Sequence, residues 1–314
     1  MIWVPRSIEH LGPALLILPD DTLFQGLLLV GFRDDRLQNC GDELLDRRFR
    51  AHFGVGPRAI SSLIAAMTRY QTNNRFNLRS LFMAIYWMKR YDTEEVMASR
   101  WGFNERYCRE TVRDYVSRIR DLKPIVINFD DLAPSCRFLA VDTVHVRCQE
   151  FRYDPSSKWY SHKFNGPGVA FEVVSDPVDG QIRWINGPVP ASTHDITILR
   201  GGQKRDKKNW ERSALYFHVP NNVKLVGDSA YGGQPDKVTI TRDAHKPATK
   251  VLFARMKSMM ETCFTRLKFF TCVIGPFRHG NSTTDKLNKV KLAFEAAAVL
   301  VQFDCKNGRP LFEP

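Results

Sequence analysis

The stretch FLAVDTVHV, residues 138–146, places one carboxylate inside an apolar run that is rich in β-branched residues. Such a run is typical of a buried strand. Burial of Asp142 without a partner would cost several kcal/mol or keep its carboxyl group protonated. We therefore expect Asp142 either to have a chemical function or to form an ion pair with one of the many basic residues.

The segments around this strand predict a mixed sheet flanked by helices. Strands are expected at 137–147, 168–175, 181–186 and 223–228, with a turn at DPVDG between the second and third. Helical patterns follow at STHDITILRGG, which Ser192 or Thr193 would cap, at 248–270 and at 285–303. Strands followed by alternating helices indicate an α/β fold.

Residues 45–125 precede this sheet and have a helical pattern. A first helix is expected at Glu94–Trp101 after an N-cap at Asp92 or Thr93, then a turn at Gly102 and a second helix capped by Asn104. Basic residues lie along the second helix: Arg106, Arg109, Arg113, Arg118 and Arg120. The pattern fits a DNA-binding helix-turn-helix, and equally a helical hairpin with a solvated basic face.

These patterns divide the chain into an N-terminal arm at 1–44, the helical region at 45–125 and a sheet domain at 135–314. The arm mixes proline, glycine and short apolar runs, so we expect it to be loosely packed.

Composition favours an intracellular protein with a polyanionic partner. The 46 Lys and Arg residues outnumber 34 Asp and Glu, which gives a net charge of +12. Seven scattered cysteines without a CxxC pair argue against a disulfide scaffold or a zinc module. No signal-peptide pattern or membrane-spanning segment is expected.

Two further acids are candidates for a site with Asp142. Asp228 ends the strand-like KLVGD before SAYGG, and Glu261 borders the apolar stripe of its helix. Aspartates on adjacent strands repel each other unless one is protonated or a cation lies between them. Carboxylate oxygens prefer Mg²⁺ or Mn²⁺, and two such ions can support phosphodiester cleavage. Alternatively, Asp228 caps the following turn and Glu261 pairs with Lys257.

The segment KWYSHKFNGPG, residues 158–168, interleaves basic and aromatic side chains. Its candidate DNA contacts are Lys158, Trp159, Tyr160, His162 and Lys163, which would suit a distorted or single-stranded DNA end. The alternative is a lead-in to a hairpin whose aromatic rings belong to the core. A second basic segment, KRDKK at 204–208, suits phosphates or nuclear import, although a solvated loop explains it as well.

At these residues the sequence resembles the DDE superfamily endonucleases of Harbinger-type transposases. The resemblance spans about residues 45–312, in the ordered segments AVDTVHVRC, KWYSHKFNGPG, INGPVPASTHD, KLVGDSAYGG, METCFTRLKFF and KNGRPLF. It implies a ribonuclease-H-like fold with a catalytic, metal-binding triad at Asp142, Asp228 and Glu261. The His194-Asp195 pair matches a family HD pair, in which Asp195 is an auxiliary acid or a helix N-terminal charge. The small residue that the family often has before RLK is absent here.

The resemblance leads to two functional hypotheses. The first is a metal-dependent endonuclease or transposase that cleaves double-stranded DNA and joins its ends, acting in the nucleus, as a homodimer or with a separate DNA-binding partner protein. The second is a domesticated derivative that binds DNA or forms a complex without cutting.

Overall fold

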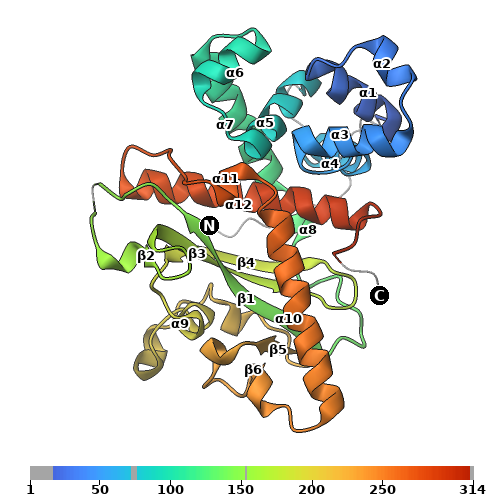
Figure 1. Ribbon diagram of the computed structural model, residues 1–314. Helices are drawn as coiled ribbons and strands as arrows, with labels where there is room; N and C mark the ends of the chain where they lie inside the picture. The colour runs from blue at the N-terminus through green and yellow to red at the C-terminus, as the bar shows by residue number, and fades with distance from the viewer. Residues whose placement is uncertain (1–16, 72–75, 153, 312–314) are drawn as a thin grey trace. The chain divides into compact units, whose positions relative to one another are not determined.

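In this computed structural model the chain is described for residues 17–71, 76–152 and 154–311, and it forms two compact units, Met1–Leu122 and Lys123–Pro314. The ribbon of each unit is drawn in Figure 1. No helix in these described ranges is long and apolar enough to cross a membrane.

The first unit is helical. Its helices are α1 (Pro19–Leu29), α2 (Asp34–Gln38), α3 (Asp42–Phe53), α4 (Pro57–Tyr70), α5 (Leu78–Arg90), α6 (Glu94–Trp101) and α7 (Glu105–Asp121).

Helix α1 corrects the expectation of a loosely packed arm for the described part of residues 1–44. Its Leu23 and Leu27 are buried, and Gly26 lies so close to Phe49 and Phe82 that a Cβ atom would clash with both rings. The α1 segment is therefore part of the core of the first unit. Residues 1–16 of the expected arm lie outside the described residues.

Helices α6 and α7 form the hairpin that the sequence predicts. Thr93 caps α6 with its side chain, Gly102 ends α6 in a left-handed conformation, and the Oδ1 of Asn104 accepts a 2.8 Å hydrogen bond from the Tyr107 amide at the start of α7. The expected inner face of α7 is buried: Val112, Tyr115, Val116 and Ile119.

Six strands of the second unit form one sheet in the described residues. They are β1 (Phe138–Arg147), β2 (Tyr160–Ser161), β3 (Gly166–Ser175), β4 (Ile182–Pro190), β5 (Lys224–Gly227) and β6 (Val238–Ile240). Strands β1, β3 and β4 are consecutive antiparallel neighbours, whereas β5 and β6 run parallel to β1 on its other side. This mixed, helix-flanked sheet is the ribonuclease-H-like arrangement that the resemblance implies.

Helices cover both faces of this sheet. They are α8 (Lys123–Val126), α9 (Asp195–Arg200), α10 (Pro247–Leu267), α11 (Thr271–Ile274) and α12 (Thr283–Lys306), with short 3₁₀ segments at η2 (Ser157–Trp159), η3 (Lys204–Asn209), η4 (Leu215–Phe217), η5 (Ser229–Tyr231) and η6 (Thr241–Asp243). On one face, Phe253 of α10 meets Phe138 of β1, and Phe294 of α12 stacks on Phe171 of β3.

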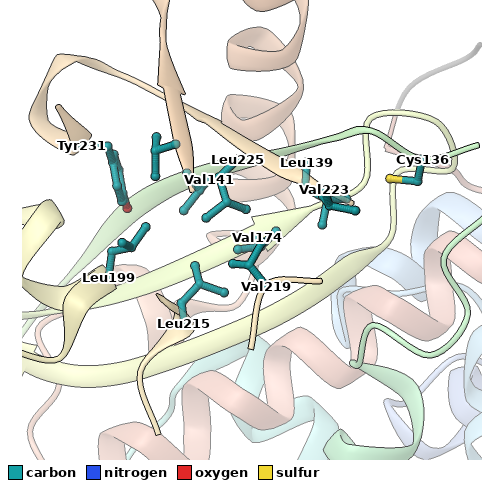
Figure 2. Close-up of a cluster of buried hydrophobic side chains, with 11 residues drawn as sticks. Cys136, Leu139, Val141, Val174, Leu199, Leu215, Val219, Val223, Leu225 and Tyr231 are labelled. Atoms are coloured by element: carbon teal, nitrogen blue, oxygen red, sulfur yellow. The ribbon is translucent and has the colours of Figure 1, made fainter. Parts of the chain in front are cut away.

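The opposite face of the sheet carries a second apolar core. There, Leu139 and Val141 of β1 pack with Leu199 of α9, Leu215 of η4 and Tyr231 of η5. Figure 2 shows these side chains converging from the strands and from the segments that cover them. Residues 139 and 141 therefore face α9, whereas Asp142 turns toward α10.

Candidate functional site

Asp142 and Asp228 lie at the same level of two neighbouring parallel strands. Ala140 of β1 is in register with Val226 of β5, and each aspartate comes two residues after its member of that pair. Adjacent strands are about 4.8 Å apart. This level is the carboxyl end of β5, where α/β sheets commonly bind ligands, whereas β1 continues past Asp142 to Arg147.

Both aspartates line one small pocket. The strands contribute Asp142 and Asp228, and α10 closes the pocket with Phe253, Met256, Lys257 and Met260. The pocket volume is about 20 Å³, which is enough for one water-sized species. Two hard carboxylate donors around a space of this size fit a single divalent cation.

The electrostatic environment of Asp142 disfavours its charged form. Burial raises the pKa of its carboxyl group to about 6, and the nearby acids Asp228 and Asp195 also raise it. A 2.7 Å hydrogen bond from the Thr143 amide and the charge of Lys163 act in the opposite direction. Placing a cation beside Asp142 would remove this penalty.

Asp195 belongs to the same electrostatic cluster. It is the first residue of α9, and burial raises the pKa of its carboxyl group, while a hydrogen bond with the Thr143 side chain and the charge of Lys163 lower it. His194 is exposed and serves as the N-cap of α9 through its backbone, so the predicted Ser192 or Thr193 cap is wrong by one or two residues.

Asp228 has the turn-capping role that the sequence offered as its alternative. Its Oδ1 accepts a 2.8 Å hydrogen bond from the Ala230 amide at the start of η5. The second oxygen of a carboxylate can still bind a metal ion, so this cap and a place in the site are compatible.

Glu261 does not line this pocket. It is an exposed residue of α10, one helical turn beyond the pocket residue Lys257, and no ion pair joins these two side chains in the described part of the chain. Within the described ranges, no group of three His, Cys, Asp or Glu side chains has an arrangement that could hold a metal ion. The structure thus brings Asp142 and Asp228 together, with Asp195 nearby, and leaves Glu261 at the margin.

A buried polar group that sequence inspection missed lies on the α9 face of the sheet. Glu172 of β3 is opposite Thr143 of β1, is completely buried, and has no hydrogen-bond partner in the described structure for either carboxylate oxygen. Burial raises its pKa well above the ordinary value. Beside it, the hydroxyl groups of Thr143 and Tyr231 are 2.9 Å apart. The same signal that marks Asp142, an acid inside an apolar strand, is present at Glu172.

The aromatic and basic residues of 158–163 have different environments. Trp159 is only 4% exposed, its ring stacks on Phe151, and its indole N–H donates to the Asp154 carbonyl. The expectation that Trp159 stacks on DNA bases is therefore not met by this arrangement, because neighbouring side chains bury the ring.

The neighbours of Trp159 are more accessible. Lys158 pairs with Asp154, whereas Tyr160 is 41% exposed and contacts the exposed His162 edge to face. Lys163 donates a 2.8 Å hydrogen bond from Nζ to the Thr143 carbonyl, so it turns back toward the aspartates.

The predicted DNA contacts on α7 are all exposed. Arg106 forms an ion pair with Glu110, and Arg109 forms one with Glu94 of α6. Arg113 is also exposed and forms no ion pair within the described residues, so no carboxylate competes with a phosphate for its guanidinium group.

Comparison with known proteins identifies the class. The model of the DDE superfamily endonuclease family matches residues 141–302, which is more than half of the chain, and the chain therefore belongs to this family. No curated protein matches it. Among solved structures, the crystal structure of a pre-cleavage Mos1 transpososome aligns over 96% of this chain and 100% of that chain, at 8% identity and a TM-score of 0.22.

Proposed function

We propose that this protein is a divalent-metal-dependent DNA endonuclease that cleaves phosphodiester bonds and transfers DNA strands, as a transposase does. The observation that carries the proposal is the small pocket shared by Asp142, in the middle of β1, and Asp228, at the carboxyl end of β5. Membership of the DDE superfamily endonucleases supports it.

Asp142 and Asp228 are the residues that would hold Mg²⁺ or Mn²⁺, with Glu261 of α10 as the third ligand by the family pattern. The bound ions, two in the full site, would supply an activated water or 3′-hydroxyl and stabilise the leaving oxygen. The fit rests on the donor chemistry: carboxylate oxygens on a rigid strand edge, with one carboxyl group whose pKa is raised by burial.

The protein's own residues orient these acids. The Thr143 amide fixes one oxygen of Asp142, and Lys163, held at the Thr143 carbonyl, stabilises the ionised forms of Asp142 and Asp195. Asp195 is an auxiliary acid in this proposal, and His194 presents it at the start of α9.

DNA binding is assigned to two surfaces. In the first unit, α6 and α7 form a helix-turn-helix whose Arg106, Arg109 and Arg113 contact phosphates. In the second unit, Lys158, Tyr160 and His162 contact the DNA near the cleavage site. The buried Trp159 holds this segment in place by packing on Phe151. Joining two DNA ends would require a homodimer, and a separate DNA-binding protein is a further partner class.

The proposed compartment is the nucleus. The KRDKK segment, Lys204–Lys208, is exposed along its whole length, as an import signal must be.

A second candidate function is a non-cleaving, domesticated DNA-binding protein. The observation that favours it is the placement of Lys257, rather than Glu261, at the pocket that holds the two aspartates. A lysine can neutralise a pair of carboxylates in place of a metal ion.

Nicking of a supercoiled plasmid distinguishes the two functions. With Mg²⁺ or Mn²⁺, we expect nicking by the wild type and none by Asp142→Asn or Asp228→Asn. Lys291→Gln, an exposed change on α12, is the matched control and should nick like the wild type. Equal nicking by the wild type and Asp142→Asn would remove the aspartate pair from the mechanism, and no nicking by any variant would favour the non-cleaving protein.

A further inference from the structure

A larger cavity lies beyond the end of β1, away from the aspartate pocket. Its volume is about 440 Å³, and it is formed by residues 149–152, which follow β1, and by Arg278, residues 280–283 and Lys286 around the start of α12. The two segments are tied together, because the Gln149 amide donates a 3.0 Å hydrogen bond to the Phe277 carbonyl.

The charged groups that line this cavity are mainly cationic. Arg152, Arg278 and Lys286 contribute three positive charges, and Glu150, an exposed residue, contributes the one carboxylate among the described lining residues. The net charge of the lining is therefore 3 − 1 = +2.

Lys286 is a buried cation without an acidic partner. Its side chain belongs to a residue that is 7% exposed, and its Nζ donates to the carbonyls of Gln149 and Glu150 and lies 5.0 Å from the centre of the Phe151 ring. No carboxylate of the described residues pairs with it, and burial lowers the pKa of Lys286, with a smaller lowering from the positive charge of Arg152. A charge that is desolvated and repelled in this way favours an anion in the adjoining cavity.

The start of α12 adds backbone donors and a hydroxyl group to the same wall. This helix has 24 residues, and its N-terminal end carries a partial positive charge. The buried Oγ1 atom of Thr283 has no hydrogen-bond partner in the described structure. Asp285, the acid of the first turn, does not line the cavity; its Oδ2 accepts a 2.8 Å hydrogen bond from the Asn281 amide and forms an ion pair with Lys289, so the Asn281 amide is not among the donors that remain.

Gly280 lets the loop approach the helix closely. It has a φ of +129°, and a Cβ atom there would lie 2.6–2.7 Å from atoms of Lys286. The loop therefore passes directly over Lys286 and brings backbone groups to the cavity wall.

We propose that this cavity is a second DNA site, which holds a backbone phosphate of the duplex through Arg152, Arg278, Lys286, Thr283 and the N-terminal end of α12. The inference rests on the proposed function for its choice of DNA as the polyanion. The site itself follows from the cavity, its net positive lining and the buried Lys286, which has no acidic partner among the described residues.

The position of the cavity suits a contact that fixes the path of the duplex. Gln149 is seven residues beyond Asp142 on a nearly continuous extended segment, which spans roughly 23 Å. At 3.4 Å per base pair, this corresponds to about six or seven base pairs from the bond to be cleaved. A phosphate held there would set the register of the DNA without reading its sequence.

The test is fluorescence anisotropy of a labelled DNA duplex in EDTA, with Asp142→Asn as the background so that no cleavage occurs. Arg152→Gln is the main variant, since Arg152 is exposed and its removal leaves the core intact. Lys286→Met and Thr283→Val are the second and third, and Lys291→Gln on the same helix removes an equal charge outside the cavity.

We expect Arg152→Gln and Lys286→Met each to weaken duplex binding by about tenfold and to reduce the salt slope of log K by about one. Lys291→Gln should leave both quantities unchanged. Unaltered affinity and slope for Arg152→Gln and Thr283→Val would overturn the proposal, as would no duplex binding by the background protein. Equal competition by polyglutamate at matched charge would also overturn it, because the cavity would then select acidic chains in general.

This outcome is independent of the nicking result. Loss of binding in Arg152→Gln without any nicking by the wild type would keep the phosphate site and reject the endonuclease. Nicking by the wild type together with unchanged duplex binding in the cavity variants would keep the endonuclease and reject the phosphate site.

Discussion

Asp142 and Asp228 occupy equivalent positions on parallel strands, each two residues beyond the Ala140–Val226 pair, and they line one pocket. Along the sequence they are far apart, and only the pairing of β1 with β5 brings them to the same edge. The site therefore depends on the register of this strand pair, since a shift of one residue would turn one of the carboxylates to the opposite face.

Asp142→Asn should stabilise the metal-free protein. The pKa of Asp142 is about 6 in the folded state, against an ordinary value of 3.8. The folded protein thus retains a proton that the unfolded chain has released, and ionisation of Asp142 destabilises the fold as pH rises from about 4 to 6. At neutral pH the cost reaches about 3 kcal/mol at most, because each pKa unit corresponds to about 1.4 kcal/mol.

Denaturant unfolding in EDTA at several pH values measures this effect. The stability difference between Asp142→Asn and the wild type should grow between about pH 4 and 6 and then remain constant. A difference that does not depend on pH would mean that Asp142 is ionised at no cost in the folded protein.

Glu172→Gln should preserve the fold and stabilise it increasingly as pH rises above the ordinary pKa of a glutamate. Burial raises the pKa of Glu172 well above its ordinary value of 4.5, so above this pH the unfolded chain releases a proton that the folded protein retains, and the wild type loses stability as pH rises toward the folded pKa. Thermal unfolding should show similar Tm values for both proteins at about pH 4 and a Tm advantage for Glu172→Gln that grows as the pH is raised. Strong destabilisation of Glu172→Gln at neutral pH would show that an ionised carboxylate is needed there.

Lys163→Met should shift the pH dependence of metal-supported nicking to higher pH. The charge of Lys163 lowers the pKa of Asp142 and of Asp195, so its removal makes both acids harder to ionise. The acidic limb of the rate profile is the relevant measurement. An unshifted limb, with only weaker DNA binding, would instead support a role of Lys163 in contacting DNA.

Arg113→Ala should weaken duplex binding more than Arg106→Ala does. Arg106 already forms an ion pair with Glu110 on the same helix, whereas Arg113 makes no ion pair in the described part of the first unit. Anisotropy at several salt concentrations should show a salt slope that is less steep by about one for Arg113→Ala. If both variants bind the duplex with the affinity and salt slope of the wild type, helices α6 and α7 do not contact DNA and serve only in packing.

Elements that are bounded by clear capping and turn residues could be predicted from the local sequence. The α6–α7 hairpin begins and ends where Thr93, Gly102 and Asn104 place its caps and turn. The packing of residues 19–29 was not predicted, because this segment packs against Phe49 and Phe82, which are distant in the sequence, and its own residues do not indicate that contact.

The candidate site was only partly predictable for the same reason. Asp142 was identified as an acid inside an apolar strand and Asp228 as an acid at a strand end, and the pairing of these strands depends on backbone hydrogen bonds. The rotation of α10 about its axis depends instead on how Met256 and Met260 pack beneath the sheet, and this packing places Lys257 at the pocket and Glu261 outside it. The burial of Trp159 likewise follows from a distant partner, Phe151, and not from its basic neighbours.

The most direct test of the central claim is Mn²⁺ binding, followed by electron paramagnetic resonance, in the wild type, Asp142→Asn, Asp228→Asn and Lys291→Gln. We predict that the wild type and Lys291→Gln bind Mn²⁺ equally and that each aspartate variant loses at least the roughly 10- to 100-fold in affinity that changes around metal sites cause. Mn²⁺ binding of equal strength in the wild type and both folded aspartate variants would contradict the claim that Asp142 and Asp228 share a metal ion.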